Sequence, residues 1–219
     1  MIGEFTHPNQ VICEGKADET FLSRLLDHAG IQANVSCPSR VADGAQGKSG
    51  IRRRLLAFQS NFGTLARIVV VVDSDNDPGT AFAEAQTEFR EANLENPNKL
   101  YDVPVEANVL SNGNPRTAIV QVPTHNTRGC LDTLLLPSFE DHCGAVHCQC
   151  TDAFCQCLNA PDRGFTNASK LRLRSLIAAI VPGNPGISIS YLMEPRNCPI
   201  SMDHLSFANL ADRMRVLLT

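Results

Sequence analysis

In Ile68-Val69-Val70-Val71-Val72-Asp73-Ser74-Asp75-Asn76-Asp77, a continuous β-branched run ends in a cluster of carboxylates. The run predicts a central strand that is covered on both faces. Because alternate residues of an extended chain point the same way, Asp73, Asp75 and Asp77 are expected on one side. Carboxylates this close repel each other unless a cation lies among them, and their hard oxygens suit Mg²⁺ or Mn²⁺. The alternative is a solvated acidic turn that caps the next helix.

A second acidic turn follows another short apolar strand. Glu14-Gly15-Lys16-Ala17-Asp18 comes directly after Val11-Ile12-Cys13. Gly15 permits a tight turn, and Asp18 is also placed to cap the helix that starts there. Sites in parallel sheets lie beyond the carboxyl ends of the strands. Both acidic turns are therefore expected at the same edge of one sheet.

Strand-like and helix-like patterns alternate through the first half of the chain. This alternation predicts an α/β fold, with a mostly parallel, Rossmann-like central sheet flanked by helices. Apolar residues at helical spacing mark helices around 21–29, 51–58 and 82–92, and 96–114 is rich in loop residues. The expected strands are 11–13, 33–37, 68–72 and 119–123.

The second half has a different pattern. A short apolar helix or turn is expected at 131–136, a Cys-rich stretch at 142–157, and helices near 173–180 and 207–217. We therefore predict a core at 1–125 and an α-rich C-terminal extension at 126–219, packed together as one compact unit.

Composition narrows the class of protein. The chain has 219 residues, enough for one domain with a real core. No apolar run approaches the roughly 20 residues that span a bilayer, and residues 1–10 lack the features of a signal peptide. The odd count of 9 cysteines favours free thiols in a reducing compartment, so a cytoplasmic location is expected. The net charge of −4 gives no global electrostatic attraction for nucleic acid.

The two acidic turns resemble the Toprim domain of topoisomerases, DnaG-type primases and OLD-family nucleases. The resemblance is a strand followed by Glu14-Gly15 and Asp18, and about 55 residues later a second strand followed by Asp73 and Asp75. It covers roughly residues 10–123. The order and spacing of these residues carry the resemblance, since each pattern alone is short.

The rest of the chain resembles small stand-alone Toprim proteins of unassigned function. Such proteins carry a Gly-rich turn, an apolar strand that ends in Pro, a Gly-x-Leu-acidic pattern and a helix led by Lys. The acidic position is more often Glu in them, whereas this chain has the shorter Asp132. The matching positions here are Gly44 to Gly47, Val122-Pro123, Gly129-Cys130-Leu131-Asp132 and Lys170.

The resemblance implies a function and a set of roles. It implies metal-dependent hydrolysis of phosphodiester bonds in nucleic acid, with DNA expected as the substrate before RNA. It also implies a role in phage defence or DNA repair. Glu14 would bind metal or act as general acid or base, while Lys48 or Lys170 would contact the scissile phosphate. In OLD nucleases two metals act on water and the leaving oxygen; by analogy, a homodimer or an ATPase partner is expected. The implied metal ligands are Glu14, Asp73 and Asp75, with Asp18, Asp77 and Asp132 as secondary candidates.

Three other features have more than one interpretation. Arg52-Arg53-Arg54 is a solvated helix face or, beside Lys48, a patch that contacts nucleic-acid phosphates. His142 to Cys157 is dense in soft ligands, but its Cys-x-Cys pairs are tighter than usual zinc spacing, so free thiols are favoured over structural zinc. Ala42 to Ser49 fits a loosened P-loop, although Ser39-Arg40-Val41 before it is a poor buried strand.

Two alternative functions therefore remain open. One is a non-catalytic Toprim module that binds nucleic acid or a partner ATPase, and the other is a P-loop nucleotide-binding protein. A phosphatase of the haloacid-dehalogenase type is disfavoured. It wants Thr or Val two residues after the second Asp, where this chain has Asp77.

Overall fold

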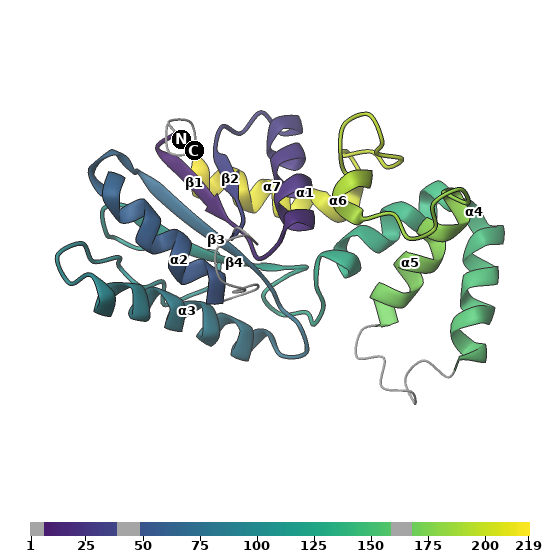
Figure 1. The fold of residues 1–219 in the computed structure, drawn as a ribbon, viewed down its shortest axis with the longest axis horizontal. Coiled ribbons are helices and arrows are strands. Elements are labelled where there is room, and N and C mark those ends of the chain that lie inside the picture. Colours follow the sequence, from purple (N-terminus) through teal and green to yellow (C-terminus); the bar gives the residue numbers. More distant parts are fainter. Residues whose placement is uncertain (1–6, 39–48, 159–167) are drawn as a thin grey trace.

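A computed structural model describes residues 7–38, 49–158 and 168–219 of the chain. Its centre is a four-stranded parallel sheet with strand order β2-β1-β3-β4 (Figure 1). The predicted α/β fold class is therefore confirmed. The strands are β1 (Asn9–Ile12), β2 (Asn34–Ser36), β3 (Arg67–Asp73) and β4 (Arg116–Val122).

The β-branched run of β3 is buried on both faces, as its sequence predicts. Val69 and Val71 belong to the hydrophobic cluster on one side of the sheet. Ile68, Val70 and Val72 belong to the cluster on the other side. Successive strand residues point to opposite faces, so a strand between two helical layers needs apolar residues at every position.

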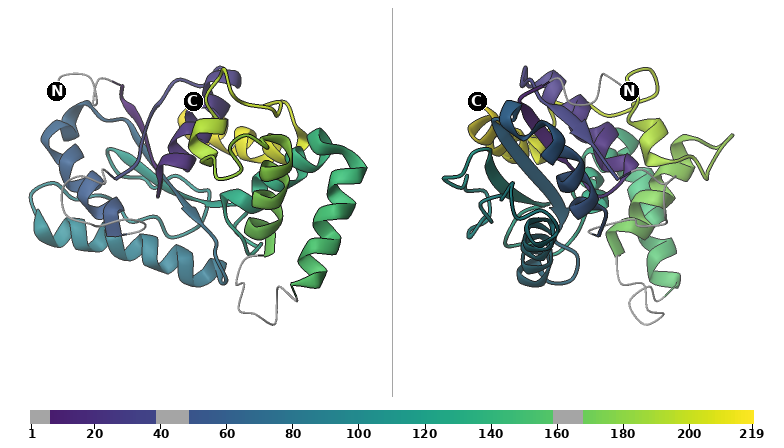
Figure 2. Two further views of the ribbon diagram at one scale, coloured as in Figure 1. Left: turned by 45° about the vertical axis from the view of Figure 1, so that its right-hand side comes forward. Right: turned by 60° about the vertical axis from the view of Figure 1, so that its left-hand side comes forward.

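Helices cover the two faces of the sheet (Figure 2). Residues of α2 and α3 form one cluster with the sheet, and residues of α1 and α7 lie in the other. The bounds are α1 (Lys16–His28), α2 (Ser49–Phe58), the 3₁₀ helix η1 (Gln59–Thr64), α3 (Pro78–Glu95), α5 (Ala168–Ile180), α6 (Ile189–Leu192) and α7 (Leu205–Leu218).

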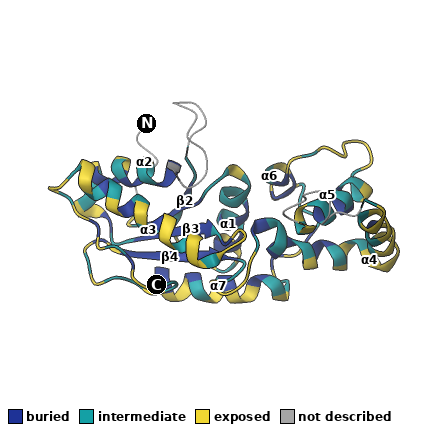
Figure 3. Cartoon of the chain, turned by 90° about the horizontal axis from the view of Figure 1, so that it is seen from below, coloured by how far each residue is buried: buried dark blue, intermediate teal, exposed yellow. Residues whose placement is uncertain are grey.

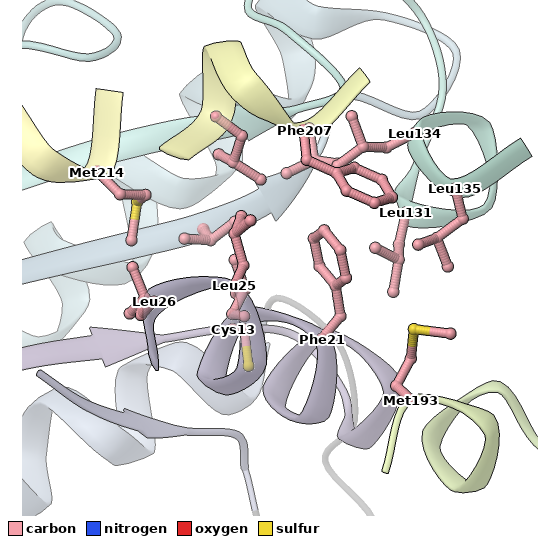
Figure 4. Close-up of a cluster of buried hydrophobic side chains, with 14 of the residues drawn as sticks. Cys13, Phe21, Leu25, Leu26, Leu131, Leu134, Leu135, Met193, Phe207 and Met214 are labelled. Atoms are coloured by element: carbon pink, nitrogen blue, oxygen red, sulfur yellow. The ribbon is translucent and has the colours of Figure 1, made fainter. Parts of the chain in front are cut away.

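The two parts expected from the sequence share one hydrophobic cluster. Phe21 of α1 packs edge-on against Phe207 of α7, with ring centroids 5.2 Å apart. Leu131, Leu134 and Met193 lie around this pair (Figure 4). The extension and α1 together therefore bury the face of the sheet that α2 and α3 leave uncovered.

Helix α4 (Leu131–Cys157) is longer than expected. The sequence predicts a short helix or turn at 131–136, but helical structure continues through the Cys-rich stretch. The helix is kinked at Gly144, whose φ of 76° and ψ of 171° are non-helical. Beyond the kink, α4 pairs with α5 and projects from the sheet (Figure 1); we call residues 145–157 and α5 the arm. Much of α4 in the arm is exposed (Figure 3).

Within the described ranges, no helix combines the length and apolar character needed to cross a membrane.

Candidate active site at the carboxyl edge of the sheet

Glu14 and Asp73 are joined at the carboxyl ends of β1 and β3. Glu14 accepts a hydrogen bond through Oε1 from the backbone N–H of Asp73, at 3.0 Å. Asp73 in turn accepts one through Oδ1 from the backbone N–H of Leu131, also at 3.0 Å. The two carboxylates therefore tie two neighbouring strands to the first turn of α4.

Asp75 has a left-handed backbone conformation that residues other than glycine rarely adopt. Its φ is +48°, and its backbone exchanges two hydrogen bonds with Gly129, at 2.7 and 2.8 Å. Gly129 has a φ of +136°, and a Cβ there would lie 2.6 Å from Oγ1 of Thr133. Only glycine fits this position, and its pairing places the exposed Asp75 beside the start of α4.

Asp18 and Asp132 occupy the first turns of α1 and α4. The backbone of Gly15, the N-cap of α1, favours the ionised form of Asp18 and lowers its pKa. Burial nevertheless raises the pKa of Asp18 to about 6, and the nearby charge of Asp132 adds to this shift. Oδ1 of Asp132 is buried and has no hydrogen-bond partner among the described residues.

The surroundings of Asp73 shift the pKa of its carboxyl group strongly. Burial is the main cause that raises its pKa to about 9, followed by the charges of Asp18 and Glu14. The hydrogen bond from Leu131 opposes this shift but does not overcome it. The raised pKa values of Asp73 and Asp18 mean that the carboxylates at this edge repel one another when all are ionised. A bound proton or cation would relieve this repulsion.

A cavity of about 660 Å³ opens at this edge. The carboxylates of Asp73, Asp75 and Asp132 share its lining with the cations of Arg128 and Lys170. A second space of only about 10 Å³ lies between α1 and β3 and is lined by Glu14, Asp18 and Asp73. Asp73 lines both spaces, so the predicted residues are divided between two spaces that share this side chain.

Arg128 is the charged residue in the lining of this cavity that the sequence does not single out. It is exposed, lies directly before Gly129, and its positive charge lowers the pKa of Asp77. A cation immediately before the Gly-Cys-Leu-Asp turn is the only sequence feature that points to it.

Asp77 has a structural role. As the N-cap of α3 it accepts hydrogen bonds from the backbone N–H groups of Gly79 (2.9 Å) and Thr80 (3.3 Å). These bonds and one from the Thr80 hydroxyl hold the pKa of Asp77 below its usual range. Asp77 lines neither of the two cavities at this edge. The capping interpretation therefore describes its observed contacts.

The basic run has contacts within the fold. Arg52 lies against three glutamates of α3, at 3.4 Å from Glu95, 3.8 Å from Glu91 and 4.0 Å from Glu88. Arg52 therefore joins α2 to α3.

The other members of the expected phosphate-contacting patch differ from Arg52. Arg54 donates to the Ser36 hydroxyl at 3.3 Å and lies 5.9 Å from the ring centre of Phe58. Arg53 is exposed. Lys48 and the Gly-rich turn at 44–47 lie outside the described residues, as does most of the P-loop-like segment.

All nine cysteines are free thiols. In the described part of the chain, no group of three or more His, Cys, Asp or Glu side chains is arranged to hold a metal ion. This applies both to the Cys-rich part of α4 and to the carboxylates at the sheet edge. Any ion at the sheet edge would require the side chains there to turn toward it.

Residues 8–186 match the family model described as "Protein of unknown function (DUF3226)". The match covers more than half of the chain, which therefore belongs to this family. Comparisons with curated proteins and with solved structures gave no match.

Proposed function

We propose that this member of the DUF3226 family is a divalent-metal-dependent phosphodiesterase that hydrolyses nucleic acid, with DNA as the expected substrate ahead of RNA. The observation that carries the proposal is the cavity in which Asp73, Asp75 and Asp132 face Arg128 and Lys170. Carboxylates suit a cation, and paired cations suit a phosphate. The resemblance of the two acidic turns to Toprim domains supports the same chemistry.

The donor set fits Mg²⁺ or Mn²⁺ in kind. All the candidate ligands are carboxylate oxygens, and Oδ1 of Asp132 is buried without a hydrogen-bond partner among the described residues. Asp73, Asp75 and Asp132 would hold the ion from the cavity side, with Glu14 and Asp18 behind Asp73. Asp75 is exposed and Asp132 partly so, which leaves both side chains room to turn. When bound, the ion would neutralise charge on the reacting phosphate.

The residues of the chain would act on the substrate as follows. Lys170 and Arg128 bind the non-bridging oxygens of the phosphate and orient it toward the carboxylates. A water oxygen forms a new bond to phosphorus, and a carboxylate that lines the cavity, such as Asp75 or Asp132, accepts the proton that this water loses. The bridging P–O bond breaks, and the leaving oxygen takes up a proton. The products are a phosphomonoester and a free hydroxyl group.

The test is cleavage of labelled DNA and RNA by the full chain with Mg²⁺ or Mn²⁺. Wild type should cleave, while Asp73→Asn and Glu14→Gln should each lose nearly all activity. Asp27→Asn, an exposed aspartate outside this edge, is the matched control and should remain active. Failure of the wild-type protein to cleave any of these substrates would refute catalysis by this chain.

A non-catalytic role is the second candidate function. The absence of a ready-made metal group among the described residues favours it. Such a module would bind nucleic acid, or a partner ATPase, through the same edge. Binding of DNA without cleavage at any metal concentration, weakened by Lys170→Ala and Arg128→Ala, would select this role.

A cytoplasmic location is part of the proposal. It is supported by the nine cysteines, all of which are free thiols. Oxidising compartments usually convert such cysteines to disulfides.

A further inference from the structure

The arm part of α4 has apolar residues on two opposite faces. One face packs against α5 and contains the buried Thr151 and the partly buried Cys148 and Cys155. The opposite face is exposed, with Val146 at 71% and Phe154 at 47% of their full accessible surface. At 3.6 residues per turn, its members lie within about 100° of arc. We call these residues the arm stripe: Val146, Cys150, Ala153, Phe154 and Cys157.

The charges around the arm stripe limit what can cover it. Asp152 is the only Asp, Glu, Lys or Arg within residues 145–157, and it pairs with Arg172 on the α5 side. Uncharged Gln149 and Gln156 flank the stripe on one side, and the exposed His147 flanks it on the other. Helices that lie on membranes carry Lys and Arg toward anionic lipid, and this one carries neither. A strongly acidic or basic partner would likewise find no run of opposite charge within residues 145–157.

The spacing of the arm stripe fits a second copy of itself. Val146, Cys150, Ala153 and Cys157 follow one another at intervals of four, three and four residues. This order reads the same in both directions. An identical helix packed antiparallel about a two-fold axis at the centre therefore sets Val146 opposite Cys157 and Cys150 opposite Ala153. Phe154 then lies over the aliphatic part of Gln149 of the other copy.

We propose that the arm stripe is a self-association surface, on which the same face of a second copy packs antiparallel. The contact is isologous, as in most homodimers. The dipoles of the two antiparallel helices point in opposite directions, which favours this arrangement. The stripe is about 18 Å long. A contact of this size is smaller than a standard interface of ~1,600 Å², so the dimer is expected to be weak and dependent on concentration. The proposal does not depend on the function of the sheet edge.

Sedimentation velocity of the full chain over a concentration series, with a thiol reductant, tests the proposal. Wild type should shift reversibly from monomer to dimer. Val146→Glu and Phe154→Glu should each raise the dimer dissociation constant about tenfold or more. Val105→Glu is the matched control, because Val105 is an 88% exposed valine outside the arm. Circular dichroism should show that all three variants remain folded.

Thiol cross-linking tests the orientation. In Val146→Cys, a short bismaleimide should link the new thiol to Cys157 of the other copy, as peptide mapping would show. Links that join position 146 to itself would instead indicate parallel helices and overturn the antiparallel arrangement. A wild type that stays monomeric up to its solubility limit, or a dimer that Val105→Glu weakens as much as Val146→Glu does, would overturn the proposal itself.

Discussion

The central sheet and the arm bury their apolar residues in different ways. Every position of β3 from Ile68 to Val72 is buried, because helices of the same chain cover both faces. The arm part of α4 is also apolar on two faces, but within the described residues α5 covers only one of them. An apolar pattern therefore indicates burial reliably only where the chain itself supplies the cover. The arm stripe is the place where the cover must come from elsewhere.

The largest expected effect compares two phenylalanines of α4. Phe139, before the kink, is fully buried, whereas Phe154 in the arm is 47% exposed. Phe139→Ala should lower the free energy of unfolding by about 3–5 kcal/mol, because it leaves a cavity in the shared core. Phe154→Ala should lower it by less than about 1 kcal/mol in the monomer. Urea denaturation at low protein concentration measures both, and equal losses would show that the arm is as closely packed as the core.

The next effect tests the pairing that places Asp75. Gly129→Ala should cost about 3 kcal/mol of stability, because its positive φ is strained and its Cβ would collide with Thr133. Gly30→Ala is the matched control. Its φ is +68°, but a Cβ there meets nothing within 4 Å, so about 1 kcal/mol is expected. Equal costs in thermal unfolding would mean that the contact with Thr133 relaxes freely.

A pH-dependent loss of stability is expected at the sheet edge. Because the pKa of folded Asp73 is raised to about 9, the folded chain holds a proton there that the unfolded chain releases near pH 4. Stability from this group is thus fully present below about pH 4 and falls as the pH rises toward 9. Asp18 acts in the same sense up to about pH 6.

Asp73→Asn removes this titration. In EDTA at pH 8 the variant should be more stable than wild type by about 2 kcal/mol. Mg²⁺ or Mn²⁺ should stabilise wild type more at pH 8 than at pH 6, since the ion displaces the proton. If Asp73→Asn and wild type show the same stability profile between about pH 5 and pH 8, Asp73 is ionised there without metal.

The smallest effect separates capping from metal binding at Asp77. Asp77→Ala should cost about 1 kcal/mol of stability through loss of the α3 cap, whereas Asp77→Asn should cost less than about 0.5 kcal/mol because Asn caps well. If Asp77 is only a cap, nuclease activity should survive in Asp77→Asn. If Asp77→Asn loses activity but keeps its stability, Asp77 takes part in metal binding.

The sheet could be predicted from the sequence because local pattern and burial agree there. The expected strand at 68–72 is β3 (Arg67–Asp73), and the strand at 119–123 overlaps β4 (Arg116–Val122). Because sites in parallel sheets lie beyond the carboxyl ends of the strands, the sequence also predicts that Glu14 and Asp73 lie at one edge. The position of Lys170 near these turns was expected only from the resemblance to Toprim proteins, because no local sequence rule relates α5 to β3.

Other features depended on tertiary structure that the sequence does not contain. The pairing of Arg52 with Glu88, Glu91 and Glu95 requires the relative position of α2 and α3. The full length of α4 does not follow from the short apolar run at 131–136, because the sequence after it indicates only a Cys-rich stretch at 142–157. Arg128 was missed because a single arginine in a loop has no pattern.

Gly144 makes the direction of the arm depend on one residue. With φ at 76° and ψ at 171°, it joins the two helical segments of α4 in a backbone conformation that residues other than glycine rarely adopt. From there to Cys157 the helix is a rod about 20 Å long. By the same helical geometry, turning the rod by about 10° moves its tip by about 3 Å. Substitution at this joint would re-aim the arm, and because α5 belongs to the arm, it would also shift Lys170 relative to the carboxylates of the sheet edge.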